Sequence, residues 1–141
     1  MRTPRNETPD WVTAEVGFAA GSHGTGVAYA DVALAGRSRV MRVPFSVQSR
    51  GSESRAVGYA ALTAIARALR GWKVERVRFA VDDPVLIADL GGHRDVPASL
   101  VMPYVHLRCA LNQLGDFDIV EAIETDLTQR ARAEVALNAA A

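Results

Sequence analysis

The sequence is poor in the features that mark several specialised classes of protein. It has one cysteine, Cys109, in 141 residues, which excludes an internal disulfide. No second thiol or nearby histidine offers metal-ligand spacing, so we expect Cys109 to pack in the core. No apolar run approaches the ~20 residues that cross a bilayer, and residues 1–10 lack the apolar stretch of a signal peptide. These absences predict a cytoplasmic protein with no membrane partner.

The chain also lacks net charge, because 16 basic residues balance 16 acidic ones. A balanced chain has no global positive field that would by itself indicate nucleic acid, so any such site must be local. Arginine supplies 15 of the 16 basic residues, and five of these arginines lie close together: Arg37, Arg39, Arg42, Arg50 and Arg55. Arginine contacts phosphate bidentately, so this segment is the candidate nucleic-acid-binding surface. The alternative is a strand edge that its charges keep soluble.

The composition is that of an ordinary globular domain, with 49% hydrophobic and 23% charged residues. A chain of this length buries one sizeable core, so we expect one domain over residues 11–141. The first ten residues hold two prolines and mixed charge, which predicts a short flexible lead-in.

The first half of the domain has the pattern of strands. Three β-like runs cover residues 11–19, 26–35 and 39–47, and glycine-containing turns separate them. They predict an antiparallel meander. Pro44 cannot donate a hydrogen bond to a neighbouring strand, so the third run should lie at a sheet edge or a bulge.

The second half alternates between helical and strand periods. We expect a helix over residues 54–70, followed by a strand that ends at Asp82. A short helix and a second helix with Pro103 in its first turn should follow. The domain should then end with a strand over residues 117–123 and a terminal helix that begins at Asp126. A strand that follows a crossover helix normally pairs parallel to an earlier strand. The fold class is therefore α/β, with a five-stranded mixed sheet flanked by helices. The expected core is Leu62, Ile65, Leu69, Val77, Phe79, Val81, Leu107, Leu111 and Ile119.

This order of elements resembles the ribonuclease H family from Trp11 to the end of the chain. The most recognisable part is AVGYAALTAIARALRGWKVERVRFAVDDPVLIADL, in which a helix rich in alanine and leucine leads into a strand that ends at an aspartate. The resemblance implies a ribonuclease H-like fold and a nuclease that uses Mg²⁺ or Mn²⁺ to cleave RNA in RNA–DNA hybrids. Members of the family hold two ions with four carboxylates, which lie on the first strand, early in the first helix, at the end of the fourth strand and in the last helix.

The resemblance carries three of these carboxylates onto this sequence, as catalytic residues and as ligands of at least one ion. Asp82 stands at the end of the fourth strand, Glu15 on the first strand and Glu134 in the last helix. Hard oxygen ligands of this type suit magnesium. The alternatives are that Asp82 or Asp83 caps the helix beginning at Pro84, and that Glu15 is a solvated strand residue.

Several departures from the family pattern weaken the expected activity. Gly58 stands where the family has its helix glutamate, and Glu53 in the preceding loop is the one substitute nearby. The Asp-Gly-Ser signature and the histidine before the last helix are missing, and His23, His93 and His106 are expected to be structural or solvent-facing.

Two function classes therefore stay open. One is a divergent and weak metal-dependent endoribonuclease. The other is a catalytically inactive ribonuclease H-fold module that binds nucleic acid or a protein partner. An unrelated α+β binding protein is a third, if the first strand is not central in a mixed sheet.

Overall fold

The computed structural model describes residues 11–47, 54–92, 95–123 and 126–140. The predicted lead-in, residues 1–10, lies outside these ranges, as do Arg50, Glu53 and His93. The strands are β1 (Val12–Ala20), β2 (Thr25–Leu34), β3 (Arg37–Ser46), β4 (Arg76–Val81) and β5 (Asp116–Glu121). The helices are α1 (Ser54–Gly71), α2 (Pro84–Leu90), the 3-10 turn η1 (Ala98–Leu100), α3 (Val101–Leu114) and α4 (Asp126–Ala140).

The strands form one mixed sheet in the order β3-β2-β1-β4-β5. The first three pair antiparallel, and β4 pairs parallel to both β1 and β5. The mixed sheet with a central first strand is therefore confirmed. Strand β3 lies at the edge, as Pro44 predicts, because an edge strand needs no partner for the missing N–H.

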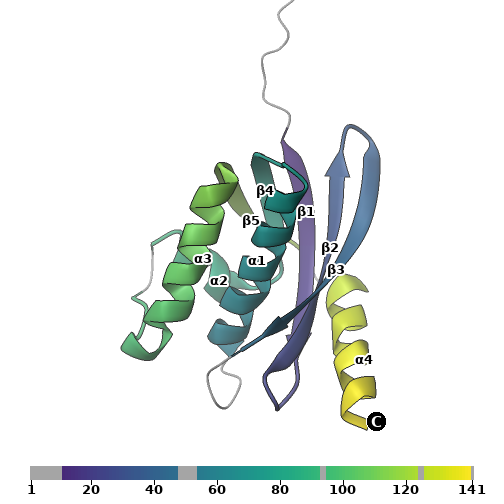
Figure 1. Cartoon of the computed structure of the whole chain (residues 1–141), viewed down its shortest axis with the longest axis vertical. Helices are drawn as coiled ribbons and strands as arrows, with labels where there is room; N and C mark the ends of the chain where they lie inside the picture. Colours follow the sequence, from purple (N-terminus) through teal and green to yellow (C-terminus); the bar gives the residue numbers. More distant parts are fainter. Residues whose placement is uncertain (1–10, 48–53, 93–94, 124–125, 141) are drawn as a thin grey trace, which may run out of the picture.

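The helices form a layer on each side of the sheet. Helices α1, α2 and α3 cover one face, and α4 lies alone beside part of the other (Figure 1). No helix in the described ranges is both long enough and apolar enough to cross a membrane.

The main core fills the space between the sheet and the α1–α3 layer, as the sequence pattern predicts. Eight of the nine expected core residues are fully buried, and Ile119 is partly buried against them. The prediction for Cys109 is wrong, because this thiol is exposed. In α3 the buried positions are Leu107, Ala110, Leu111 and Leu114, so the helix turns its Cys109 face to solvent.

Gly115 allows α3 to turn directly into β5. Its φ is +121°, and a Cβ there would lie 2.5 Å from the backbone oxygen of Glu75. The same oxygen accepts a hydrogen bond from Asp116 N at 3.0 Å, at the start of β5. Close approach of the two backbones thus sets where β5 joins β4.

We predict that Gly115→Ala lowers the free energy of unfolding by more than about 1 kcal/mol, because the side chain strains φ and collides with Glu75. Gly71→Ala is the matched control, since a Cβ at Gly71 meets nothing within 4 Å. Urea denaturation of both variants measures the difference. Equal stability of the two variants would contradict this account of the turn.

Candidate active site

Asp82 lies immediately after β4, beyond the last residue of β4 that pairs with the parallel strand β1. Its Oδ2 accepts a hydrogen bond from the Thr128 hydroxyl of α4 at 3.1 Å. Asp83 has a different role: its Oδ1 accepts from Val85 N at 3.1 Å and Leu86 N at 3.2 Å and so caps α2. Asp82 thus joins the sheet to α4, and Asp83 caps α2.

Gly17 is the β1 residue level with Asp82. The register pairs Val16 with Val81, so the next pair along is Gly17 and Asp82. A Cβ on Gly17 would lie 2.3 Å from Thr128 N and 2.6 Å from the Leu127 carbonyl carbon. The first turn of α4 therefore rests directly on the backbone of β1. No carboxylate side chain fits at this point of β1 while α4 keeps this position.

Gly58 is buried in α1, facing the start of α2. A Cβ there would lie 3.5 Å from Asp83 Oδ2, 3.5 Å from the Phe18 ring and 3.7 Å from Leu86, all ordinary contacts. The position has room for a Cβ, and the carboxylate nearest to that Cβ is that of Asp83.

Glu15 lies on the same sheet face as Asp82, two residues further back. It pairs with Ala80 on β4 and with Asp31 on β2. Sequence reasoning missed Asp31, whose Oδ1 is buried and has no hydrogen-bond partner in the described structure. Glu15 and Asp31 are thus cross-strand neighbours on β1 and β2. Their separation along the sequence does not indicate this pairing.

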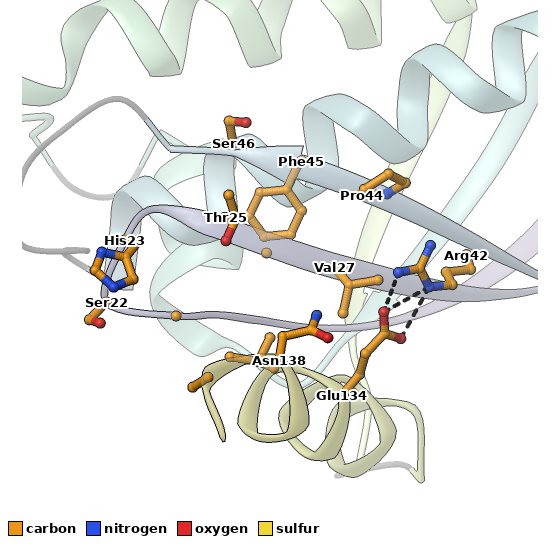
Figure 2. A pocket seen from close by; sticks show the side chains of 14 residues that line it. Ser22, His23, Thr25, Val27, Arg42, Pro44, Phe45, Ser46, Glu134 and Asn138 are labelled. Carbon is orange, nitrogen blue, oxygen red and sulfur yellow. Dashed lines mark hydrogen bonds and ion pairs between the residues drawn. The ribbon is translucent and has the colours of Figure 1, made fainter. Parts of the chain in front are cut away.

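Glu134 points toward the sheet but belongs to a different cluster (Figure 2). It accepts hydrogen bonds from the Tyr29 hydroxyl and from Arg42, whose Nε lies 3.1 Å and 3.0 Å from the two carboxylate oxygens. These donors, with Arg42 first, lower the pKa of Glu134 to about 2, and the bond to Glu134 raises the pKa of Tyr29. The six residues from Thr128 to Glu134 span about 9 Å of helix, so Glu134 lies far from Asp82.

The predicted carboxylates are therefore not gathered around one point. In the described ranges, no group of three or more His, Cys, Asp or Glu side chains is arranged to hold a metal ion. The Thr128 hydroxyl contacts Asp82, and the backbone of Thr128 packs on Gly17. One carboxylate and one hydroxyl do not match the four carboxylates that hold two ions close together, because too little negative charge offsets the repulsion between the cations.

The arginines of β3 have different surroundings. Arg42 is tied to Glu134, whereas Arg37 and Arg39 are exposed, and the Arg39 guanidinium lies 5.0 Å from the centre of the Trp72 ring. Trp72 follows α1 and is 41% exposed. Arg39 and the Trp72 ring thus lie together, with Arg37 two residues away along β3, and we call these three residues the Arg37–Arg39–Trp72 corner. The sequence gives no hint that Trp72 lies there. His23 and His106 are exposed, as expected.

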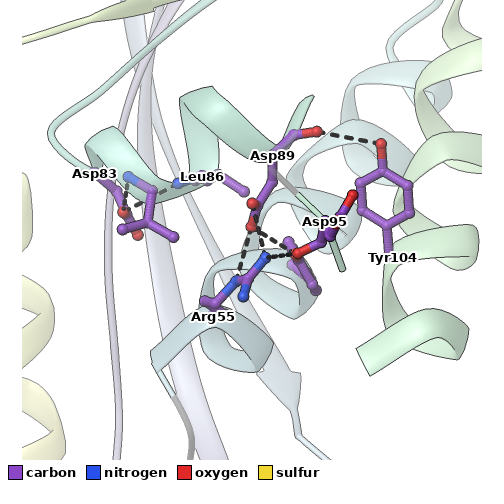
Figure 3. Close-up of polar contacts among 8 residues, drawn as sticks. Arg55, Asp83, Leu86, Asp89, Asp95 and Tyr104 are labelled. Atoms are coloured by element: carbon purple, nitrogen blue, oxygen red, sulfur yellow. Dashed lines mark hydrogen bonds and ion pairs between the residues drawn. The ribbon is translucent and has the colours of Figure 1, made fainter. Parts of the chain in front are cut away.

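Arg55 is held in a buried network, shown in Figure 3. Its Nε and Nη2 donate to the two oxygens of Asp89 at 3.0 Å and 2.8 Å, and the Tyr59 hydroxyl donates to the same carboxylate at 2.6 Å. Asp89 is 1% exposed, and burial together with this bond raises the pKa of Tyr59 to about 12. The guanidinium joins α1 to α2, so in this arrangement it does not face a phosphate.

Asp89→Ala should lower the free energy of unfolding by about 3–5 kcal/mol, because it leaves the Arg55 charge and the Tyr59 hydroxyl buried without their acceptor. Asp118→Ala removes a carboxylate that pairs with Arg78 at the surface, and is expected to cost at most about 1 kcal/mol. Chemical denaturation compares the two variants. A similar loss from both would show that the network around Asp89 contributes no more than a surface pair.

The Glu134 cluster predicts a pH dependence of stability. The folded pKa of about 2 lies below the ordinary value of 4.5, so this group stabilises the fold above pH 4.5, and that contribution is lost as the pH falls toward 2. The stability difference between the natural chain and Glu134→Gln should be largest above pH 4.5 and shrink between pH 4.5 and 2. Thermal unfolding across this range measures it. A difference that stays constant would mean that Glu134 is not held by Arg42 and Tyr29 in solution.

Comparison with solved structures agrees with this topology. The ribonuclease H1 of the archaeon Halobacterium salinarum NRC-1 superposes with a TM-score of 0.70 at 19% identity, covering 91% of this chain and 98% of that one. The N-terminal ribonuclease H domain of a Mycobacterium tuberculosis protein gives 0.71 at 16% identity, with 92% and 99% covered. A ribonuclease H1 crystallised with an RNA/DNA hybrid gives 0.64 at 12% identity, with 92% and 99% covered.

Sequence comparisons add nothing to this similarity: no family model matches the chain, and no curated protein matches it. The similarity is therefore one of three-dimensional structure, and it covers 91–92% of the chain. The chain has a ribonuclease H-like fold.

Proposed function

We propose that this protein is a ribonuclease H-fold module that binds nucleic acid and hydrolyses RNA–DNA hybrids weakly or not at all. The observation that carries the proposal is the contact between α4 and β1. A Cβ at Gly17 would lie 2.3 Å from Thr128 N, so the place beside Asp82 is filled by helix backbone. Gly58 adds no carboxylate from the α1 side, and the Asp83 carboxylate nearby is used to cap α2.

The nucleic-acid part of the proposal rests on the fold and on the Arg37–Arg39–Trp72 corner. One similar structure was solved with an RNA/DNA hybrid. Exposed arginines supply phosphate contacts, and an exposed tryptophan ring supplies a surface on which a base can stack. Arg42 and Arg55 are already paired with Glu134 and Asp89, so they contribute less.

A weak nuclease with a single ion is the second candidate, because Asp82 keeps the place at the end of the fourth strand. Magnesium binds proteins through one or two carboxylates together with waters and substrate phosphates. In that case Asp82 would hold the ion, with Glu15 as the nearest predicted acid on the same sheet face.

Binding and cleavage of a fluorescent RNA–DNA hybrid, in the presence of Mg²⁺ or Mn²⁺, tests both candidates. We expect binding without efficient cleavage, and we expect Asp82→Asn to leave both unchanged. Efficient cleavage that Asp82→Asn abolishes would overturn the inactive module and establish the nuclease.

The same hybrid locates the binding surface. Each of Arg37→Ala and Arg39→Ala should weaken binding and lower the slope of log affinity against log salt by about one. Arg76→Ala is the control, because Arg76 already pairs with Asp116 at 3.4 Å on another strand. If all three variants weakened hybrid binding equally, the Arg37–Arg39–Trp72 corner would not be the binding surface.

A further inference from the structure

A groove lies between the edge strand β3 and helices α1 and α3, on the face of the sheet opposite α4. It has a volume of about 760 Å³. Its walls are largely apolar: Val43, Phe45 and Val47 come from the β3 side, Ala60 and Ala64 from α1, and Met102 from α3. The Asp82 site, the Glu134 cluster and the Arg37–Arg39–Trp72 corner share no residue with these walls.

Helix α3 exposes large apolar side chains at and next to the residues that line the groove. At the start of α3, Val101 is 42% exposed, Met102 62% and Val105 41%. These three residues occupy the first two turns of one helix, next to the groove wall that Met102 forms. Apolar groups gathered beside a groove differ from isolated surface apolar residues, and such gatherings mark interaction sites.

The described lining of the groove holds one charged side chain, the exposed Arg67, and no aspartate or glutamate. An occupant with acidic residues at this end would find charge complementarity, whereas a basic occupant would be repelled.

The edge strand argues against an added β-strand as the occupant. Pro44 pairs with Val27 across β3 and β2, and since proline cannot donate, the outer edge of β3 lacks a donor in the middle of the groove wall. A helix needs no backbone hydrogen bonds from its receptor and docks through side chains at i, i+3, i+4 and i+7.

We propose that this groove binds an amphipathic helix of a partner protein, with its apolar face against Met102 and the α1 alanines and its acidic residues next to Arg67 and His106. This site is independent of the nucleic-acid function, because it lies away from Asp82 and uses none of the exposed β3 arginines. The preferred ligand is therefore an apolar and acidic helix of another chain.

A displayed library of 16-residue peptides, selected on the full chain, tests the proposal. We expect the selected peptides to carry apolar residues at helical spacing together with aspartate or glutamate. Synthetic copies of these peptides should bind with measurable anisotropy and lose about tenfold or more in affinity on Met102→Glu and on Arg67→Glu. Both residues are exposed, so we expect the variants to fold, which their thermal transitions check.

Leu137→Glu is the control for Met102→Glu, because Leu137 is 71% exposed on α4, across the sheet from the groove. Arg70→Glu is the control for Arg67→Glu, since Arg70 lies one turn further along α1 and does not line the groove. Both controls should leave affinity within about twofold. Failure to select any peptide, selection of basic or extended peptides, or equal losses in the control variants would overturn the proposal.

Two further results would assign the groove to another occupant and also overturn it. A concentration-dependent dimer of the natural chain that Met102→Glu dissolves, seen by sedimentation, would identify a second copy. Loss of RNA–DNA hybrid binding on Met102→Glu would identify nucleic acid.

Discussion

The contact between the first turn of α4 and the middle of β1 determines the surroundings of Asp82. Glycine at position 17 lets the backbone of Leu127 and Thr128 approach β1 more closely than any side chain would permit. The Thr128 hydroxyl then reaches Asp82 at 3.1 Å and satisfies one of its oxygens. Asp82 thus lies beside a packed helix terminus and accepts a hydroxyl–carboxylate hydrogen bond from it.

The rest of α4 follows from this anchor. Once its first turn is fixed on β1, Ala131 is buried against the sheet and Glu134 reaches Tyr29 and Arg42. Arg42 and Tyr29 are paired residues on β3 and β2, so one carboxylate fastens α4 to two strands. Glu134, which the resemblance to ribonuclease H predicts as a metal ligand, pairs instead with Arg42. Arg55, a predicted phosphate contact, is likewise an ion-pair partner, because its guanidinium pairs with the buried Asp89.

The fold could be predicted from the sequence because its signals are local. The alternation over residues 76–81, the helical stripe of Leu62, Ile65 and Leu69, and the proline in β3 each fix one element or its place. Of the three predicted carboxylates, only Asp82 has a position that follows from local sequence signals, since it comes directly after a buried strand. Strand register decides that Gly17, and not Glu15, is level with Asp82, and helix placement decides that Thr128, and not Glu134, touches it. Neither can be obtained from spacing along one chain.

We infer that the surroundings of Asp82 suit helix packing rather than a pair of divalent ions. Titration of Mn²⁺ into the natural chain and into Thr128→Asp, followed by calorimetry, tests it most directly, because the substitution places a second carboxylate where Thr128 now contacts Asp82. The account predicts at most one weak site in the natural chain and tighter binding in Thr128→Asp. Two tight sites in the natural chain, lost on Asp82→Asn, would contradict it.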